Sequence, residues 1–264
     1  MPGSIQIAQL SLAQIRDLIR SGEGFDQQMR DQLHGDSRRG ALKLWRSLQK
    51  TKDQRLRAKV RLRDLIAPEK NLRRQGFRAI AGLDEAGRGP LAGPVVSAAV
   101  VAPWPCHWLG VDDSKRLTPG AREAHAQRIL DEALAFGLGI VSAERIDTVG
   151  ILQATWESMR RALASMSLRP DHLLVDGPLP IPGVSVSQTP LVDGDARSLS
   201  VAAASVVAKV TRDQIMRDLD NQHPQYGFAR HKGYGTREHL AALRRYGPCL
   251  VHRRSFRGVL ERTG

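Results

Sequence analysis

The stretch that decides the fold is IAGLDEAGRGPLAGPVV, residues Ile80 to Val96. An apolar run leads into two adjacent acids, Asp84 and Glu85, and a Gly-Arg-Gly turn follows at once. The small and β-branched residues before the acids are typical of a strand, and the glycines end it. Unpaired carboxylates this close together repel each other and resist ionisation. The stretch therefore predicts a strand whose end presents two acids to a functional site.

Outside this stretch, short apolar runs alternate with helical patterns from Phe77 onward. This alternation predicts an α/β layer fold with a largely buried sheet. The predicted strands are residues 78–83, 94–102, 138–146 and 172–177. The predicted helices are residues 119–136, 150–166, 198–221 and 237–246. A loop rich in Pro and Gly, residues 178–195, is predicted to be exposed.

The N-terminal part has the pattern of a small helical module. Ser11 to Gln14 has the form of a capping box, and a second short helix is predicted around residues 25–33. Apolar residues then recur at helical spacing over residues 37–67. We predict two domains, a basic helical extension at residues 1–75 and a catalytic domain at residues 76–264.

The formal net charge of +13 over 264 residues favours a polyanionic partner. Residues 1–78 carry 18 of the 40 Lys and Arg against 8 of the 27 Asp and Glu, so the rest carry 22 against 19. This uneven division favours a phosphate-binding arm, and the alternative is a helix made soluble by arginine. The arm residues that we expect to hold duplex phosphates are Arg55, Arg57, Lys59, Arg61 and Arg63.

Two cysteines provide no disulfide framework and no CxxC metal pair, which favours a reducing cytoplasm. We expect no secretory signal and no membrane span, because no apolar stretch approaches about 18 residues. Oligomeric state is not encoded in any recognisable pattern, so a monomer is the default expectation.

Four acids fall where strands or loops end, namely Asp84, Glu85, Asp176 and Asp195. A divalent cation removes the repulsion between such carboxylates, and Mg²⁺ or Mn²⁺ prefers oxygen ligands. Each acid taken alone has another reading as a turn former or helix cap, and we assign that reading to Asp193. The four acids form a site only if the fold brings them together.

The same residues carry a resemblance to a known family. Five motifs match bacterial ribonuclease HII in its order, from about Arg78 to Phe256: IAGLDEAGRGPLAGPVV, then DDSKRLT, LLVDG, GDARSLSVAAASVVAKVTRD and YGFARHKGYGT. The resemblance implies a ribonuclease H-like core with a central mixed five-stranded sheet flanked by helices. It also implies an endonuclease that cuts the RNA strand of RNA–DNA hybrids and nicks 5′ of single ribonucleotides in duplex DNA.

The resemblance further implies that Asp84, Glu85, Asp176 and Asp195 are catalytic ligands of two metal ions, Mn²⁺ or Mg²⁺. By the same resemblance, Gly87, Arg88 and Gly89 read the 2′-hydroxyl of the ribonucleotide, and Tyr234 packs on the adjoining deoxyribose. Lys115 is implied to lie near the substrate backbone, and a DNA sliding clamp is a candidate partner. Arg88 is what distinguishes the motif from that of ribonuclease HIII.

Other residues near these motifs have more than one possible role. Lys209 and Arg212 are one helical turn apart and suit either a salt bridge or a phosphate contact. The run Ala202 to Ser205 is expected to pack closely under the site, and His231 is expected to be structural or substrate-facing. Two other functions are open, a non-catalytic nucleic-acid-binding protein and a glycoside hydrolase with a carboxylate pair. The net charge of +13 makes the glycosidase remote.

Overall fold

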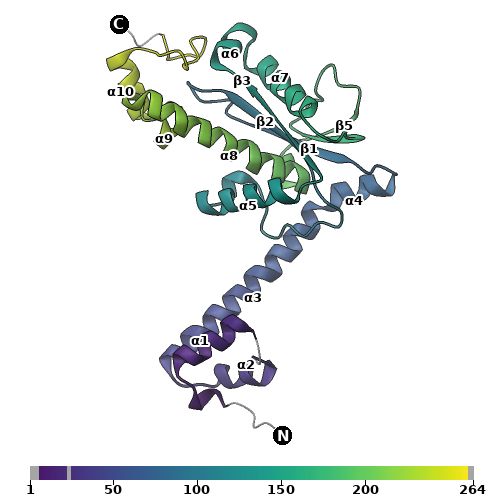
Figure 1. The fold of residues 1–264 in the computed structure, drawn as a ribbon, viewed down its shortest axis with the longest axis vertical. Helices are drawn as coiled ribbons and strands as arrows, with labels where there is room; N and C mark the ends of the chain where they lie inside the picture. Colours follow the sequence, from purple (N-terminus) through teal and green to yellow (C-terminus); the bar gives the residue numbers. More distant parts are fainter. Residues whose placement is uncertain (1–5, 23–24, 261–264) are drawn as a thin grey trace. The chain divides into compact units, whose positions relative to one another are not determined.

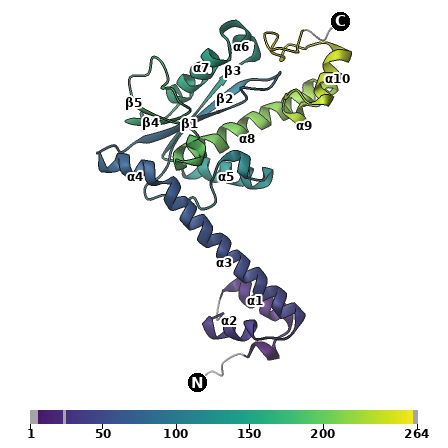
Figure 2. The same cartoon turned by 180° about the vertical axis from the view of Figure 1, so that it is seen from behind.

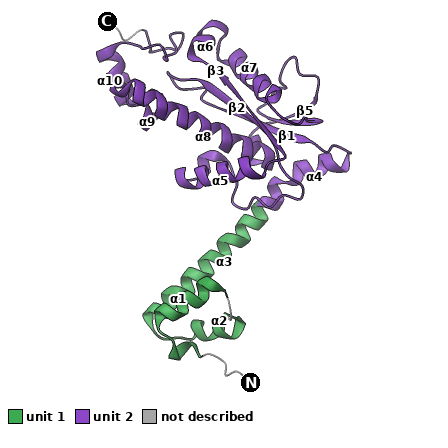
Figure 3. Ribbon diagram, viewed as in Figure 1, with its two compact units in different colours: residues 1–61 green, residues 62–264 purple. Residues whose placement is uncertain are grey.

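The computed structural model describes residues 6–22 and 25–260. It divides into two compact units, residues 1–61 and 62–264 (Figure 3). The first unit contains three short elements and most of the long helix α3: η1 (Ile7–Gln9), α1 (Leu12–Ser21), α2 (Gln27–His34) and α3 (Arg39–Leu65). The predicted capping box is confirmed, because the Ser11 hydroxyl accepts from the Gln14 N–H and the Gln14 side chain accepts from the Ser11 N–H. The domain boundary after residue 75 is a different division and stays a prediction.

The second unit is built on one five-stranded sheet in the order β3-β2-β1-β4-β5 (Figure 1). β1 pairs antiparallel with β2 and parallel with β4, so the sheet is mixed, as the resemblance implied. The strands are β1 (Ile80–Ala86), β2 (Val95–Val101), β3 (Ala135–Val141), β4 (His172–Asp176) and β5 (Ser187–Leu191). All seven residues of β2 are buried, because helices cover both faces of the sheet.

Helix α8 (Leu199–Gln222) packs on one face of the sheet and α7 (Ile151–Ala164) on the other, as Figures 1 and 2 show from opposite sides. The remaining elements are α4 (Ala67–Arg74), η2 (Ser114–Arg116), α5 (Pro119–Glu132), α6 (Ala143–Val149), η3 (Gly194–Ala196), η4 (Pro224–Tyr226), α9 (Phe228–His231) and α10 (Arg237–Tyr246). None of the described helices, the 27-residue α3 included, is both long and apolar enough to cross a membrane.

Small residues bring α8 against β1. A Cβ atom on Gly82 would lie 2.1 Å from the carbonyl carbon of Ser200, so only glycine permits this approach. Ala202, Ala203 and Ala204 are fully buried on α8, which confirms the predicted close packing of this run. The helix also receives a buried carboxylate at its first turn, where Glu69 Oε1 accepts from the Ser200 N–H at 2.9 Å. α4 is thereby tied to the first turn of α8.

Three sequence predictions of secondary structure were wrong in part. Residues 135 and 136, predicted as the end of a helix, are the first residues of β3. Residues 143–146, predicted as the end of a strand, begin α6, because the Ser142 hydroxyl accepts from the Arg145 N–H and caps a helix. The predicted loop 178–195 contains β5, which pairs parallel with β4 at the edge of the sheet. Its sequence SQTPL includes Pro190, which an edge strand tolerates, so it lacked the composition of a central strand. Ile181 of this loop is also buried rather than exposed.

Candidate active site

A cavity of about 280 Å³ lies at the carboxyl ends of β1 and β4. It is lined by carboxylates, cations, two serines and one tyrosine: Asp84, Glu85, Ala86, Gly87, Arg88, Gly89, Ser114, Lys115, Arg122, Asp176, Ser205, Lys209, Arg212 and Tyr234. Eight of the nine predicted site residues are therefore brought to one place. The ninth, Asp195, is not among the lining residues, and its position is described below.

Parallel pairing places two of the acids side by side. Leu83 of β1 is in register with Val175 of β4, so the next residues along these strands are Asp84 and Asp176. Neighbouring strands lie about 5 Å apart, and residues in register point to the same face. The sequence alone could not supply this pairing, because 92 residues separate the two acids.

Burial and mutual repulsion raise the pKa values of these acids. Burial raises the pKa of Asp84 well above its usual value, and the charges of Glu85 and Asp176 raise it further. The pKa of Glu85 is raised by burial and by Asp176, while the Arg88 guanidinium opposes this. Burial also raises the pKa of Asp176, against the Gly194 N–H, which donates to Asp176 Oδ1 at 2.7 Å. Without a cation bound among them, simultaneous ionisation of all three carboxyl groups is therefore unfavourable.

Asp195 stands beside this group rather than inside the cavity. It is buried in η3, directly after Gly194, and the charge of Asp176 raises its pKa after burial and Asp113 have done so. Lys115 Nζ donates to Asp195 Oδ2 at 3.3 Å and feels the charges of both Asp195 and Asp84. Lys115 is therefore paired with Asp195 and lies near enough to Asp84 to interact with its charge.

The donor set suits a hard divalent cation, because every candidate ligand is a carboxylate oxygen. Within residues 6–22 and 25–260, however, no three His, Cys, Asp or Glu side chains converge closely enough to make a ready metal site. Two of these carboxylates form ion pairs instead: Arg88 Nη1 lies 3.4 Å from Glu85 Oε1, and Lys115 Nζ lies 3.3 Å from Asp195 Oδ2. Two cations of the chain thus partly neutralise the charges of Glu85 and Asp195.

The Gly-Arg-Gly turn forms one wall of the cavity, and its two glycines differ in how closely other residues pack around them. Gly87 has φ +97°, and a Cβ atom there would lie 2.0 Å from Arg212 Nε. A Cβ atom on Gly89 would have only an ordinary contact, 3.8 Å from Tyr234 Cε1. The backbone conformation and the packing against Arg212 therefore require glycine at position 87. At position 89 the protein itself has space for a larger side chain.

Tyr234 is 47% exposed and faces this turn from the segment after α9. Its backbone is fixed, because its carbonyl accepts from the Thr236 N–H at 2.8 Å and lies 2.9 Å from His239 Nδ1. His231 has a structural position: it is buried, and its Nε2 lies 2.8 Å from the Tyr226 carbonyl oxygen. An exposed aromatic ring on a rigid backbone is a surface on which a sugar or base can pack.

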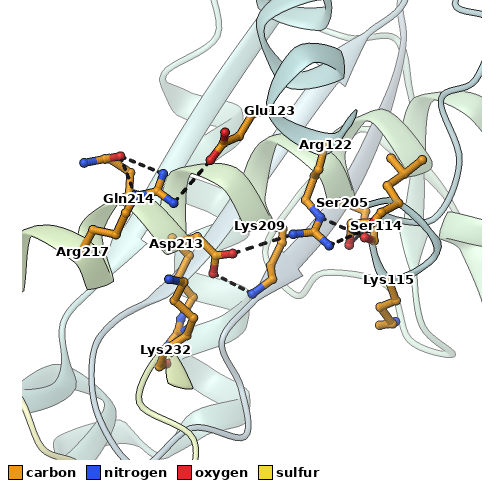
Figure 4. Close-up of polar contacts among 12 residues, drawn as sticks. Ser114, Lys115, Arg122, Glu123, Ser205, Lys209, Asp213, Gln214, Arg217 and Lys232 are labelled. Atoms are coloured by element: carbon orange, nitrogen blue, oxygen red, sulfur yellow. Dashed lines mark hydrogen bonds and ion pairs between the residues drawn. The ribbon is translucent and has the colours of Figure 1, made fainter. Parts of the chain in front are cut away.

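The two readings of Lys209 and Arg212 are resolved differently. Lys209 Nζ pairs with Asp213 Oδ1 at 2.6 Å, and Arg122 approaches the other oxygen of Asp213 at 3.9 Å (Figure 4). Arg122 also donates to the carbonyl oxygens of Ser114 and Leu117, which holds the loop that carries Lys115. Arg212 has no carboxylate partner among the described residues, and its buried guanidinium donates to three backbone carbonyls instead.

Sequence reasoning assigned no role at the site to Ser114, Ser205 or Arg253. Ser205 and Ser114 line the cavity with their hydroxyls 2.9 Å apart, and a hydrogen bond from Ser205 lowers the pKa of Asp84 against its burial. Ser205 is thus more than a packing residue. Arg253 is fully buried and holds the Gly-Arg-Gly turn, whereas the adjacent Arg254 is exposed. No local pattern distinguishes these two arginines.

Comparison with known proteins agrees with this geometry. The family model of ribonuclease HII matches residues 81–259. Ribonuclease HII of Geobacillus thermodenitrificans is 48% identical over 256 residues, which cover 97% of this chain and 98% of that protein.

Solved structures are similar as well. The ribonuclease H2 of Pyrococcus horikoshii OT3 is 27% identical with a TM-score of 0.61, covering 70% of this chain and 96% of that one. The ribonuclease HII of Archaeoglobus fulgidus, solved in a complex with PCNA, is 28% identical with a TM-score of 0.58, covering 68% and 96%.

Proposed function

The chain belongs to the ribonuclease HII family, and from this premise we propose how its cavity carries out the reaction. Members of this family cleave RNA in RNA–DNA hybrids with a divalent metal, and so does this chain. We propose that Asp84, Glu85, Asp176 and Asp195 hold two ions, either Mg²⁺ or Mn²⁺. The observation that carries the proposal is that the parallel pairing of β1 with β4 brings Asp84, Glu85 and Asp176 into one cavity.

Ions bound there would lower the pKa of a water molecule and neutralise charge on the phosphate. The chain supplies the rigid frame, since the Gly194 N–H fixes Asp176 and the Glu85 N–H donates to Asp84 Oδ1 at 2.6 Å. The side chains of Lys115 and Arg88 are 81% and 51% exposed in their present ion pairs. Such exposed pairs are weak, so both cations can turn to phosphate oxygens when a substrate and metal arrive.

The substrate would be read by the turn and the tyrosine together. The 2′-hydroxyl is the group that separates RNA from DNA at a given nucleotide. Backbone N–H groups of Gly87, Arg88 and Gly89 are suited to meet that hydroxyl, and Tyr234 is suited to pack on the adjoining deoxyribose. We propose that this selects the 5′ side of a ribonucleotide, including a single one within duplex DNA.

The test is cleavage of a duplex that contains one ribonucleotide, with Mg²⁺ or Mn²⁺ and then with excess chelator. We expect nicking 5′ of the ribonucleotide that stops when the metal is removed. Asp84→Asn and Asp176→Asn should each abolish turnover while the circular dichroism spectrum is unchanged. Asp193→Asn is the matched control, because Asp193 is exposed in the same loop as Asp195 and asparagine accepts its φ of +54°.

Wild-type rates in either cavity variant would contradict the metal assignment. Binding without any cleavage would favour the non-catalytic alternative, and cleavage that survives the chelator would rule out metal dependence. A sliding-clamp partner is a separate proposal, supported by the PCNA complex of the Archaeoglobus fulgidus protein. Co-elution of the full chain with a purified clamp tests it, and separate elution would refute it.

A further inference from the structure

Two arginine side chains beneath the Gly-Arg-Gly turn have almost no exposed surface. Arg212 is 1% exposed and Arg253 is 0% exposed. Neither has an Asp or Glu oxygen within 4.0 Å among the residues that the structure describes. A buried charge without a carboxylate partner is costly unless hydrogen bonds satisfy it. Both guanidinium groups are satisfied by backbone carbonyl oxygens alone.

Arg253 draws four carbonyl groups of one turn to itself. Its Nη2 donates to Gly87 O at 2.6 Å, and its Nη1 donates to Arg88 O at 2.9 Å and Pro90 O at 2.8 Å. Its Nε donates to Gly93 O at 3.0 Å. Only arginine carries five N–H donors in a fixed planar fork, so no other side chain can reproduce this set.

Arg212 joins the same turn to the segment that carries Tyr234. Its Nε donates to Pro94 O at 2.9 Å and its Nη2 to Ala92 O at 3.1 Å. Its Nη1 donates to Lys232 O at 3.0 Å, and Lys232 itself has φ +53°. The Gly-Arg-Gly turn and the Tyr234 segment, which we propose to contact the sugar, are thus held together by one buried side chain, Arg212.

These hydrogen bonds fix which way the peptide groups of the Gly-Arg-Gly turn face. Its carbonyl oxygens at Gly87 and Arg88 are drawn into the protein, toward Arg253. The N–H groups of Gly87, Arg88 and Gly89 donate to no acceptor within residues 6–22 and 25–260, and all three residues line the cavity. Unpaired backbone donors beside a site are normally occupied by water or a ligand.

We infer that Arg212 and Arg253 are positioning residues that set the preference for ribose over deoxyribose. Arg253 keeps the carbonyl oxygens of Gly87 and Arg88 away from the substrate, so that only N–H donors face the 2′-hydroxyl. Arg212 ties the following residues Ala92 and Pro94 to Lys232, next to Tyr234, and so holds the turn and the tyrosine together. This inference rests on the proposed reading of that hydroxyl by the Gly-Arg-Gly turn. The alternative is that both arginines stabilise the fold and have no effect on substrate choice.

The experiment measures binding rather than turnover, in an Asp84→Asn background without metal. The dissociation constants are compared for a duplex with one ribonucleotide and for the same duplex made entirely of DNA. We expect the ratio of the two constants to fall by about tenfold in Arg253→Gln, the change produced when one hydrogen bond to the sugar is lost. Affinity for the all-DNA duplex should stay unchanged. Arg253→Lys keeps the charge and three donors, so its ratio should lie in between.

Met159→Ala is the control for stability, because Met159 is buried in α7 on the opposite face of the sheet. It should lower the melting temperature and leave the ratio unchanged. Arg212→Lys provides a second test that does not depend on the folding of the Arg253 variants. A parent ratio of one would refute the reading of the 2′-hydroxyl itself. A parent that discriminates, with arginine variants that discriminate equally well, would overturn the positioning role alone.

Amide hydrogen exchange of the parent protein adds a readout that needs no arginine variant. The N–H groups of Gly87 and Gly89 should exchange rapidly in the free protein. They should gain protection with the ribonucleotide-containing duplex and little protection with the all-DNA duplex. Protection of these amides in the free protein would mean that they already have an acceptor, and the inference would fail.

Discussion

Alanine substitutions at Gly87 and Gly89 have opposite expected effects, although the two glycines are separated by a single residue. In Gly87→Ala the new methyl group would meet Arg212 Nε at 2.0 Å, at a φ of +97°. That backbone conformation costs a non-glycine residue about 1–3 kcal/mol. Moving Arg212 aside would also weaken its three hydrogen bonds, worth about 1 kcal/mol each. We therefore expect a loss of roughly 3–5 kcal/mol of unfolding free energy.

A loss of this size lowers the melting temperature by about 6–20 °C, at roughly 2–4 °C per kcal/mol for a domain of this size. Gly89→Ala should behave differently, because its methyl group would lie 3.8 Å from the nearest protein atom, Tyr234 Cε1. Its stability should stay within about 1 kcal/mol of the parent. The same methyl group points to the cavity wall that a sugar must approach, so cleavage at a ribonucleotide should fall at least about tenfold.

The assay is paired, with thermal melting by circular dichroism and cleavage rates on a single-ribonucleotide duplex from the same preparations. Gly120→Ala is the control, since no described atom beyond its chain neighbours and its own helix backbone lies within 4 Å of the added Cβ atom, and Gly120 does not line the cavity. Equal melting of the Gly87 and Gly89 variants would refute the role of Arg212 beneath the turn. Full cleavage by Gly89→Ala would refute close approach of the substrate at this wall.

Three further predictions follow from charge and exposure. The pKa values of the cavity carboxyl groups are raised, so the folded protein keeps protons that the unfolded chain has already released. The stability of the metal-free protein therefore falls as the pH rises above about 4. Added Mg²⁺ should therefore raise the melting temperature more at about pH 8 than at about pH 5, and an equal rise would contradict the coupling. Replacing the exposed Arg55, Arg57 and Lys59 by Gln should reduce the salt slope of duplex binding by about 2–3, and an unchanged slope would leave the arm without a phosphate role. Tyr234→Ala should slow cleavage at a single ribonucleotide more than cleavage of an all-RNA hybrid strand, and equal losses would argue against packing on the deoxyribose.

Much of the core was predictable from local pattern. The apolar runs before Asp84 and Asp176, and the run over residues 95–101, identified β1, β4 and β2, because strands buried on both faces are rich in apolar residues. The motif order also identified the family and the central mixed sheet. β5 was missed because an edge strand tolerates residues such as Pro190 and Gln188 that local pattern assigns to loops.

Local sequence by itself determined which residues we propose for the chemistry: two acids at the end of a strand, a glycine turn, and two later acids in matching motifs. Only the tertiary structure decided which partner each has, such as Lys115 for Asp195 across 80 residues of chain. Arg253 and Arg254 show the limit most clearly, since they are identical neighbours and only Arg253 is buried. Its place is set by carbonyl groups of a turn 160 to 166 residues earlier, a long-range contact that no local pattern encodes.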